Sequence, residues 1–138
     1  MTITALQRRA REARGWLLDA CFPLWSEVGV KKQLFAERLD LSHKPVDTEL
    51  TRVRVQARQT YLFSLAEQMD WNPQRARDLV ELGVSVLSGP ALRSDGLVGK
   101  ILAFDTAALT DKTADLYDTA FVLFALCLLY TSPSPRDA

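Results

Sequence analysis

The chain has few side chains that bind metals or undergo redox chemistry: one histidine and two cysteines among 138 residues. Cys21 and Cys127 do not form a Cys-x-x-Cys pair. Together with His43 they fall short of the ligand set of a structural zinc site. Gly-rich and Walker fingerprints for phosphate binding are missing as well. We therefore predict no bound metal and no cofactor.

An excess of charge of one sign is also missing, since 17 Lys and Arg balance 17 Asp and Glu. Nucleic-acid binding requires surplus positive charge, so the balance argues against a nucleic-acid partner except through a local patch. The longest apolar run, residues 120–130, is shorter than the roughly 18 residues of a membrane span. The N-terminus lacks the apolar segment of a signal peptide. We expect a cytoplasmic protein with no membrane partner.

Hydrophobic residues, by contrast, make up 48% of the chain, which predicts an ordered core. They recur at helical spacing in four segments, at residues 4–26, 49–69 and 73–88 and from about 112 onward. Asn72, Pro73 and Gly89 mark clear boundaries for the third helix. The first and third helices carry one apolar stripe each, whereas the second and fourth are apolar on several sides. The sequence therefore predicts an all-α fold in which half-exposed helices alternate with covered ones.

Two long loops separate these helices, at residues 30–50 and 89–111. Both have the pieces of a short hairpin, and the polar stretch Ser42–Pro45 forms the tip of the first. The covered helices begin about 62 positions apart, near Thr51 and Thr113. This order of half-exposed helix, loop and covered helix, used twice, favours a helical-repeat architecture.

The last residues break the pattern with Ser-Pro-Ser-Pro at 132–135. Back-translated, Cys127–Asp137 matches a transposase adapter used to prepare sequencing libraries, read in frame at the end of a truncated gene. The alternative is an ordinary Pro-rich tail. We predict that residues 1–126 are native sequence and that residues 127–138 are an artefactual tail, to be excluded from fold reasoning.

Arg58 is the most informative polar position, because Val55 and Leu62 place its guanidinium within an apolar stripe. A charge there needs an anionic or oxygen-rich partner. Two interpretations remain open. One is a ligand-binding role, and the other is a structural ion pair with Asp115 or Asp118 on the fourth helix.

Asp115 and Asp118 lie three apart at the start of the fourth helix, hence on one face. Such a carboxylate pair suits acid and base catalysis on a glycoside. It equally suits the positive end of the helix dipole. Between them, Tyr117 is placed to line a sugar site through its ring and its hydroxyl. His43, in the loop tip, is expected to be solvated rather than catalytic.

Two stretches, Arg54–Phe63 (RVQARQTYLF) and Asp115–Leu126 (DLYDTAFVLFAL), resemble the N-acylglucosamine 2-epimerase family of sugar epimerases and isomerases. The resemblance implies the N-terminal part, about four helices, of an (α/α)6 toroid like that of six-hairpin glycosidases. Arg58 corresponds to a pocket arginine that contacts substrate oxygens, and Tyr117 to an aromatic residue at the pocket wall. The chain departs from the family pattern at Lys32–Leu34 and at Thr119.

The family chemistry implied is proton transfer beside a sugar carbonyl, either C2 epimerisation or aldose–ketose isomerisation, on mannose-type sugars among others. The family's catalytic histidines lie on later helices, so no catalytic residue is expected in this chain, which we predict to be inactive alone. The partner implied is a small sugar, and a homodimer is compatible with the full-length protein. Two other functions stay open: a glycoside-cleaving toroid enzyme that uses Asp115 and Asp118, and a non-catalytic helical-repeat binding module.

Overall fold

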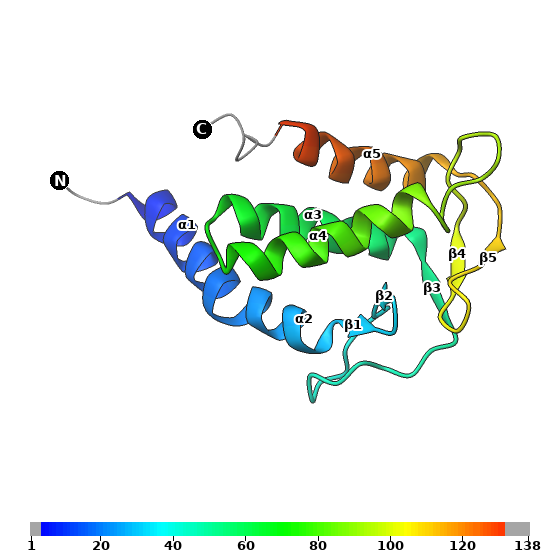
Figure 1. Ribbon diagram of the computed structural model, residues 1–138. Helices are drawn as coiled ribbons and strands as arrows, with labels where there is room; N and C mark the ends of the chain where they lie inside the picture. The colour runs from blue at the N-terminus through cyan, green and yellow to red at the C-terminus, as the bar shows by residue number, and fades with distance from the viewer. Residues whose placement is uncertain (1–3, 132–138) are drawn as a thin grey trace.

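The computed structural model describes residues 4–131, as an arrangement of helices joined by short strands at one end (Figure 1). The helices are α1 (Ala5–Trp16), α2 (Phe22–Val28), α3 (Val53–Gln68), α4 (Pro73–Ser88) and α5 (Leu116–Thr131), with a π-helical turn at Leu17–Cys21. The strands are β1 (Val30–Lys31), β2 (Leu34–Phe35), β3 (Leu50–Arg52), β4 (Ile101–Ala103) and β5 (Leu109–Asp111). The mainly helical fold expected from the sequence is confirmed.

The first predicted helix is interrupted. Instead of one helix over residues 4–26, the π-helical turn joins α1 to α2, which ends at Val28 with Gly29 as its C-cap. A π turn contains an extra residue, so it rotates the helical stripe. Hydrophobic spacing read from the sequence alone does not reveal that rotation. At the other end, Thr4 and Gln7 form a capping box that begins α1.

The third predicted helix has the expected boundaries. Asn72 accepts a hydrogen bond from the backbone N–H of Arg75, Pro73 occupies the first turn, and Gly89 is the C-cap of α4. Gly83 faces α3, and a Cβ there would lie 1.9 Å from Oγ1 of Thr60. This glycine therefore permits the close packing of α4 on α3.

The predicted second helix begins four residues late, because residues 50–52 form strand β3 instead of a helical turn. β3 pairs antiparallel with β4, Leu50 opposite Ala103 and Arg52 opposite Ile101, and β4 pairs with β5. The hairpin predicted in the second loop is thus confirmed. Its pairing with β3 was not predicted, since a strand of three residues leaves no periodic signal and gains its hydrogen bonds only from a distant partner.

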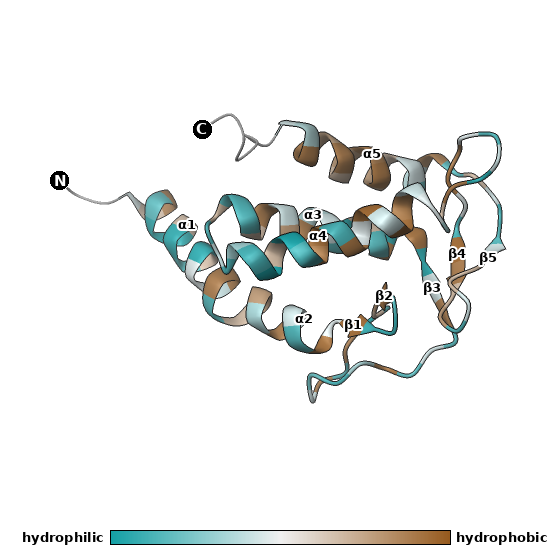
Figure 2. Ribbon diagram, viewed as in Figure 1, coloured by the Kyte–Doolittle hydropathy of each residue, from teal (hydrophilic) through white to brown (hydrophobic). Residues whose placement is uncertain are grey.

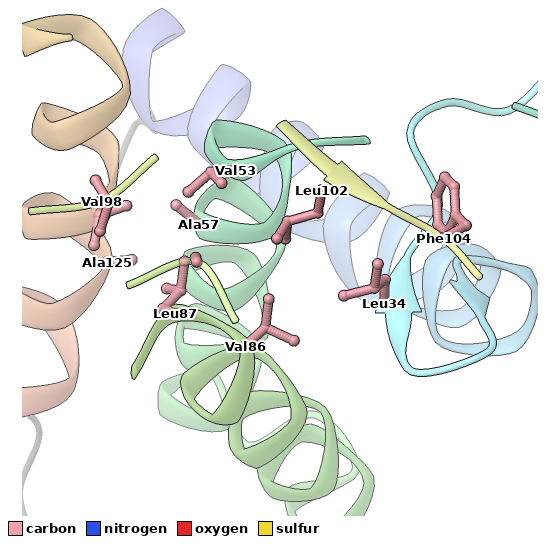
Figure 3. Close-up of a cluster of buried hydrophobic side chains, with 11 residues drawn as sticks. Leu34, Val53, Ala57, Val86, Leu87, Val98, Leu102, Phe104 and Ala125 are labelled. Carbon is pink, nitrogen blue, oxygen red and sulfur yellow. The ribbon is translucent and has the colours of Figure 1, made fainter. Parts of the chain in front are cut away.

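Two clusters of buried apolar side chains surround α3. One lies between α3, α4, α5 and β4, and Figure 3 shows its members Val53 and Ala57 of α3 facing Leu87 of α4 and Ala125 of α5. The other packs Phe63 and Ala66 of α3 against α2, α4 and β2. Helix α3 is therefore covered on several sides, as predicted.

Helix α5 differs from its prediction. It begins at Leu116 rather than near Lys112, because the side chain of Asp115 accepts the backbone N–H of Asp118 and β5 occupies residues 109–111. It was expected to be buried on most sides, yet its buried residues are Asp118, Val122 and Ala125. Figure 2 shows α5 apolar along most of its length, with α3 and α4 on one side of it.

The artefactual tail remains a prediction. Residues 127–131 continue α5 as a helix, and residues 132–138, which include the Ser-Pro-Ser-Pro stretch, lie outside the described part of the chain. Within residues 4–131, no helix is both long and apolar enough to cross a membrane.

Candidate functional site

Helices α3 and α5 lie side by side and run in the same direction, and their facing side chains form the candidate site (Figure 1). Contacts join Arg54 to Tyr117, Arg58 to Phe121, and Tyr61 to Phe124. The partners in each pair are 63 positions apart in the sequence. Steps of four and three residues put each set on one face of its helix. Parallel helices in matching register therefore bring cationic and aromatic groups together.

Arg58 contacts Tyr117, the other residue that the sequence singled out for substrate binding. Its Nη2 donates to the Tyr117 hydroxyl at 3.1 Å, and its guanidinium carbon lies 4.1 Å from the centre of the Phe121 ring. The Arg58 side chain is exposed. Within residues 4–131 no carboxylate pairs with it. The guanidinium therefore has hydrogen-bond donors left for oxygen atoms of a ligand.

The structural ion pair considered for Arg58 is formed by another arginine. Nη1 of Arg54 lies 3.3 Å from Oδ1 of Asp118, whose side chain is 1% exposed. Arg54 lies one turn before Arg58, so both sit on the same helix face, and the register of α3 against α5 puts the earlier one beside the carboxylate. Of the two interpretations left open for Arg58, the ion pair with Asp115 or Asp118 is therefore not formed.

Arg54 also touches the candidate site. Its guanidinium carbon lies 5.3 Å from the centre of the Tyr117 ring, a distance suited to a cation–π contact. Both arginines thus contact the same tyrosine, Arg54 through the ring and Arg58 through the hydroxyl. Sequence reasoning missed Arg54. Arg54 lies four residues before Arg58, and this spacing indicates that both arginines lie on the same face of one helix.

Aromatic rings complete this surface. Tyr117 and Phe121 meet edge to face with their centres 5.0 Å apart, and Tyr61 stacks on Phe124 at 4.6 Å. With Ala120, three of these rings line an open recess of about 320 Å³, namely Tyr117, Phe121 and Phe124. Flat aromatic walls beside a hydrogen-bonding guanidinium suit a ligand with apolar faces and hydroxyl edges.

Asp115 has a structural position. Its Oδ1 accepts the Asp118 N–H at 2.7 Å, and its Oδ2 lies 3.3 Å from Nζ of Lys100. The hydrogen bond from the Asp118 backbone, followed by the Lys100 charge, lowers the pKa of the Asp115 carboxyl. Asp115 therefore caps the N-terminus of α5 and connects it, through the ion pair, to Lys100 just before β4.

Asp118 is placed differently from its neighbour. Burial raises the pKa of its carboxyl, the charge of Asp115 adds to the rise, and Arg54 opposes it. Its Oδ2 is buried and finds no hydrogen-bond partner within residues 4–131. A glycosidase pair needs two carboxylates that reach the substrate. One capping carboxylate and one buried beside an arginine do not fit that use.

The loop over residues 36–49 contains the predicted hairpin tip at residues 42–45, which includes His43. Asp40 holds this tip, since its Oδ1 accepts the N–H groups of Ser42 and Lys44. His43 is exposed there with a positive φ of 61°. The loop lies on the other side of the molecule from α5 in Figure 1. The expectation of a solvated His43 is confirmed.

A buried network fixes this loop to α3. Gln56 is fully buried; its Oε1 accepts the Phe35 N–H at 2.8 Å, and its Nε2 donates to the Phe35 carbonyl and to Oγ1 of Thr51. Thr51 donates in turn to Glu37, which also accepts from the side chain of Arg52. The stretch Val55–Arg58 (VQAR) therefore holds the first loop through Gln56 and places a guanidinium in the candidate site through Arg58.

With this geometry in view, comparison with known proteins identifies the family. The family model for N-acylglucosamine 2-epimerase matches residues 35–138. The chain belongs to this family. A mannose-6-phosphate isomerase from Rhizobium meliloti (strain 1021) is 33% identical over 123 residues, which cover 88% of this chain and 31% of that protein.

Solved structures agree on the fold. A cellobiose 2-epimerase from Spirochaeta thermophila matches with a TM-score of 0.78 and 20% identity over 98% of this chain and 34% of that one. A sugar epimerase from a ruminal bacterium matches with a TM-score of 0.76 and 19% identity over 92% of this chain and 33% of that one. The chain thus has the fold of part of an (α/α)6 toroid, and it spans about a third of the length of these relatives.

Proposed function

We propose that this chain forms one wall of the substrate site of a sugar epimerase or isomerase, with Arg58 and Tyr117 as substrate-binding residues. The observation that carries the proposal is the hydrogen bond between these two side chains beside an aromatic recess. Family membership supports the reaction class, since its members interconvert sugars. A mannose-type sugar is the first substrate to test, because one relative is named a mannose-6-phosphate isomerase.

The proposed chemistry is transfer of a proton at the carbon beside the sugar carbonyl. Removal of that proton develops negative charge on the carbonyl oxygen, giving an enediolate. A guanidinium fixed near this oxygen stabilises the charge, and fixed donors of this kind contribute about 3 to 4 kcal/mol to such steps. In this proposal Arg58 has that role, Tyr117 orients the sugar, and the aromatic rings cover its apolar face.

Proton transfer also needs an acid and a base that titrate near neutral pH. The chain contains one histidine, which lies in the exposed loop tip away from α5. We therefore propose that the acid and base belong to the part of the toroid that this chain does not span, and that the 138 residues alone have no turnover. Incubation with mannose in D₂O should give no deuterium at C2. Incorporation above a boiled control would contradict this.

The binding role is tested by titrating the chain with mannose in an isothermal titration calorimeter. Arg58→Ala removes a charged hydrogen-bond donor, which is worth roughly 1.5 to 3 kcal/mol, so we expect affinity to fall at least tenfold. Arg11→Ala, an exposed arginine on α1, is the matched control and should bind as the unchanged chain does. Equal affinity in all three proteins would exclude Arg58 from the site.

A further inference from the structure

The cations at the strand end of α3 and α5 are almost all matched by carboxylates. Arg52 pairs with Glu37, Arg54 with Asp118, and Lys100 with Asp115. Of the four cations Arg52, Arg54, Arg58 and Lys100, only Arg58 lacks such a partner within residues 4–131. The candidate site therefore carries about one uncompensated positive charge, although four cationic side chains lie at this end of the two helices.

Of these ion pairs, the Arg54–Asp118 pair contacts a side chain that lines the recess. Arg54 lies over the ring of Tyr117, which itself lines the recess, so its charge is one aromatic ring away from a bound molecule. Asp118 is buried against the same guanidinium, with Oδ2 unpartnered in the described structure. A buried unpartnered acceptor is costly to keep. The contact that Asp118 does make is with Arg54, whose charge it neutralises.

We propose that Asp118 sets the charge preference of the sugar site by neutralising Arg54, so that the recess favours an uncharged sugar over a sugar phosphate. The inference rests on the proposed function, since it concerns the ligand of that site. With Asp118 ionised, a phosphate meets one free guanidinium, Arg58. Without it, the phosphate meets two guanidinium groups on one helix face, a pattern that binds phosphate strongly.

The test compares dissociation constants for mannose and mannose 6-phosphate at low ionic strength. Asp118→Asn keeps the side-chain volume and frees the charge of Arg54. One added charge within about 6 Å changes the affinity for an anion by roughly tenfold at an intermediate effective dielectric constant. We expect the unchanged chain to prefer mannose, and the variant to shift the ratio about tenfold toward the phosphate. A purely structural role would weaken both ligands equally and leave the ratio unchanged.

Two further variants make the test specific. Glu67→Gln adds the same net charge by freeing Arg77, which pairs with Glu67 at the other end of α3, and it should leave the ratio unaltered. Arg54→Gln combined with Asp118→Asn removes both charges and should restore the ratio of the unchanged chain, which also controls for a folding defect in the single variant. The proposal would be overturned if Glu67→Gln shifted the ratio of dissociation constants as far toward the phosphate as Asp118→Asn does. It would also be overturned if the double variant kept the shifted ratio of Asp118→Asn.

Inorganic phosphate separates this inference from the proposed function. Titrated into the ¹⁵N-labelled chain, it should shift the Arg54 side-chain Nε–Hε signal more strongly in Asp118→Asn than in the unchanged chain. If no sugar binds any variant while this phosphate effect appears, the proposed function is contradicted and the role of Asp118 is supported. Equal phosphate binding by both proteins overturns the inference, whatever the sugars do.

Discussion

Helices α3 and α5 have the same length and face each other, yet they are covered to different extents. Helix α3 carries Arg54, Arg58 and several other polar residues, and nine of its side chains are buried. Helix α5 is apolar almost throughout, and three of its residues are buried. Apolar composition therefore does not decide burial here. Position does, since α3 lies between α2, α4 and α5, whereas the described neighbours of α5 lie on one side.

The difference is visible in the large apolar side chains of α5. Leu123 is 57% exposed and Leu126 is 39% exposed. Exposed contiguous apolar surface of this kind marks an interface with other parts of a protein. Because the chain spans about a third of the length of its relatives, we expect later helices of a longer protein to cover this face.

The largest predicted effect contrasts one apolar side chain from each helix. Phe63 of α3 is fully buried and stacks on Phe35, so Phe63→Ala should lower the free energy of unfolding by about 3 to 5 kcal/mol. Leu123→Ala on α5 should cost about 0.5 kcal/mol, as surface changes do. Urea unfolding followed by circular dichroism gives both values. Similar losses would mean that the outer face of α5 is buried in solution, for example by self-association.

The next effect concerns the ion pair that joins the two helices. Arg54→Met leaves the buried Asp118 without its cation and should lower the free energy of unfolding by about 2 to 3 kcal/mol. Arg77→Met is the matched control, because it breaks the more exposed pair of Arg77 with Glu67 and should cost less than about 1 kcal/mol. If both variants lose equally little, Asp118 is hydrated rather than buried.

The same variant has a predicted pH dependence. Burial raises the pKa of Asp118 in the folded chain and Arg54 opposes the rise, so removing Arg54 raises that pKa further. A raised carboxyl pKa lowers stability at pH values above it, and the deficit disappears as the pH falls and the group is protonated. The stability of Arg54→Met should therefore approach that of the unchanged chain in acid. A deficit that is constant from pH 7 to pH 3 would argue against this cause.

The smallest effect concerns the start of α5, and its pH dependence has the opposite sign. The lowered pKa of Asp115 stabilises the folded chain above the ordinary carboxyl range and loses this effect as the pH falls through the lowered value. Asp115→Asn keeps a capping side chain but removes the charge, so it should lose slight stability at pH 7 and none at pH 3. Asp115→Ala, which also removes the cap, should be less stable at both. Thermal unfolding at the two pH values measures the difference.

Local features were predictable from the sequence because they depend on residues close in the chain. The boundaries of α4, the hairpins, the covered character of α3 and the two family motifs all have signals within a few turns. The motifs were enough to single out Arg58 and Tyr117, which the structure brings into contact. The interrupted first helix and the late start of α3 were missed, because a π turn and a three-residue strand are too short to leave a clear signal in the hydrophobic spacing.

What only the tertiary structure decided is which charges meet. The sequence placed Arg54 and Arg58 on one helix and Asp115 and Asp118 on another, and several pairings were compatible with their spacing. The register of the two parallel helices selects Arg54 for Asp118, whereas Lys100, in the segment before β4, pairs with Asp115. That register is fixed by the packing of the apolar cluster around Val53 and Ala125 (Figure 3). Such packing depends on the whole core and cannot be read from either helix alone.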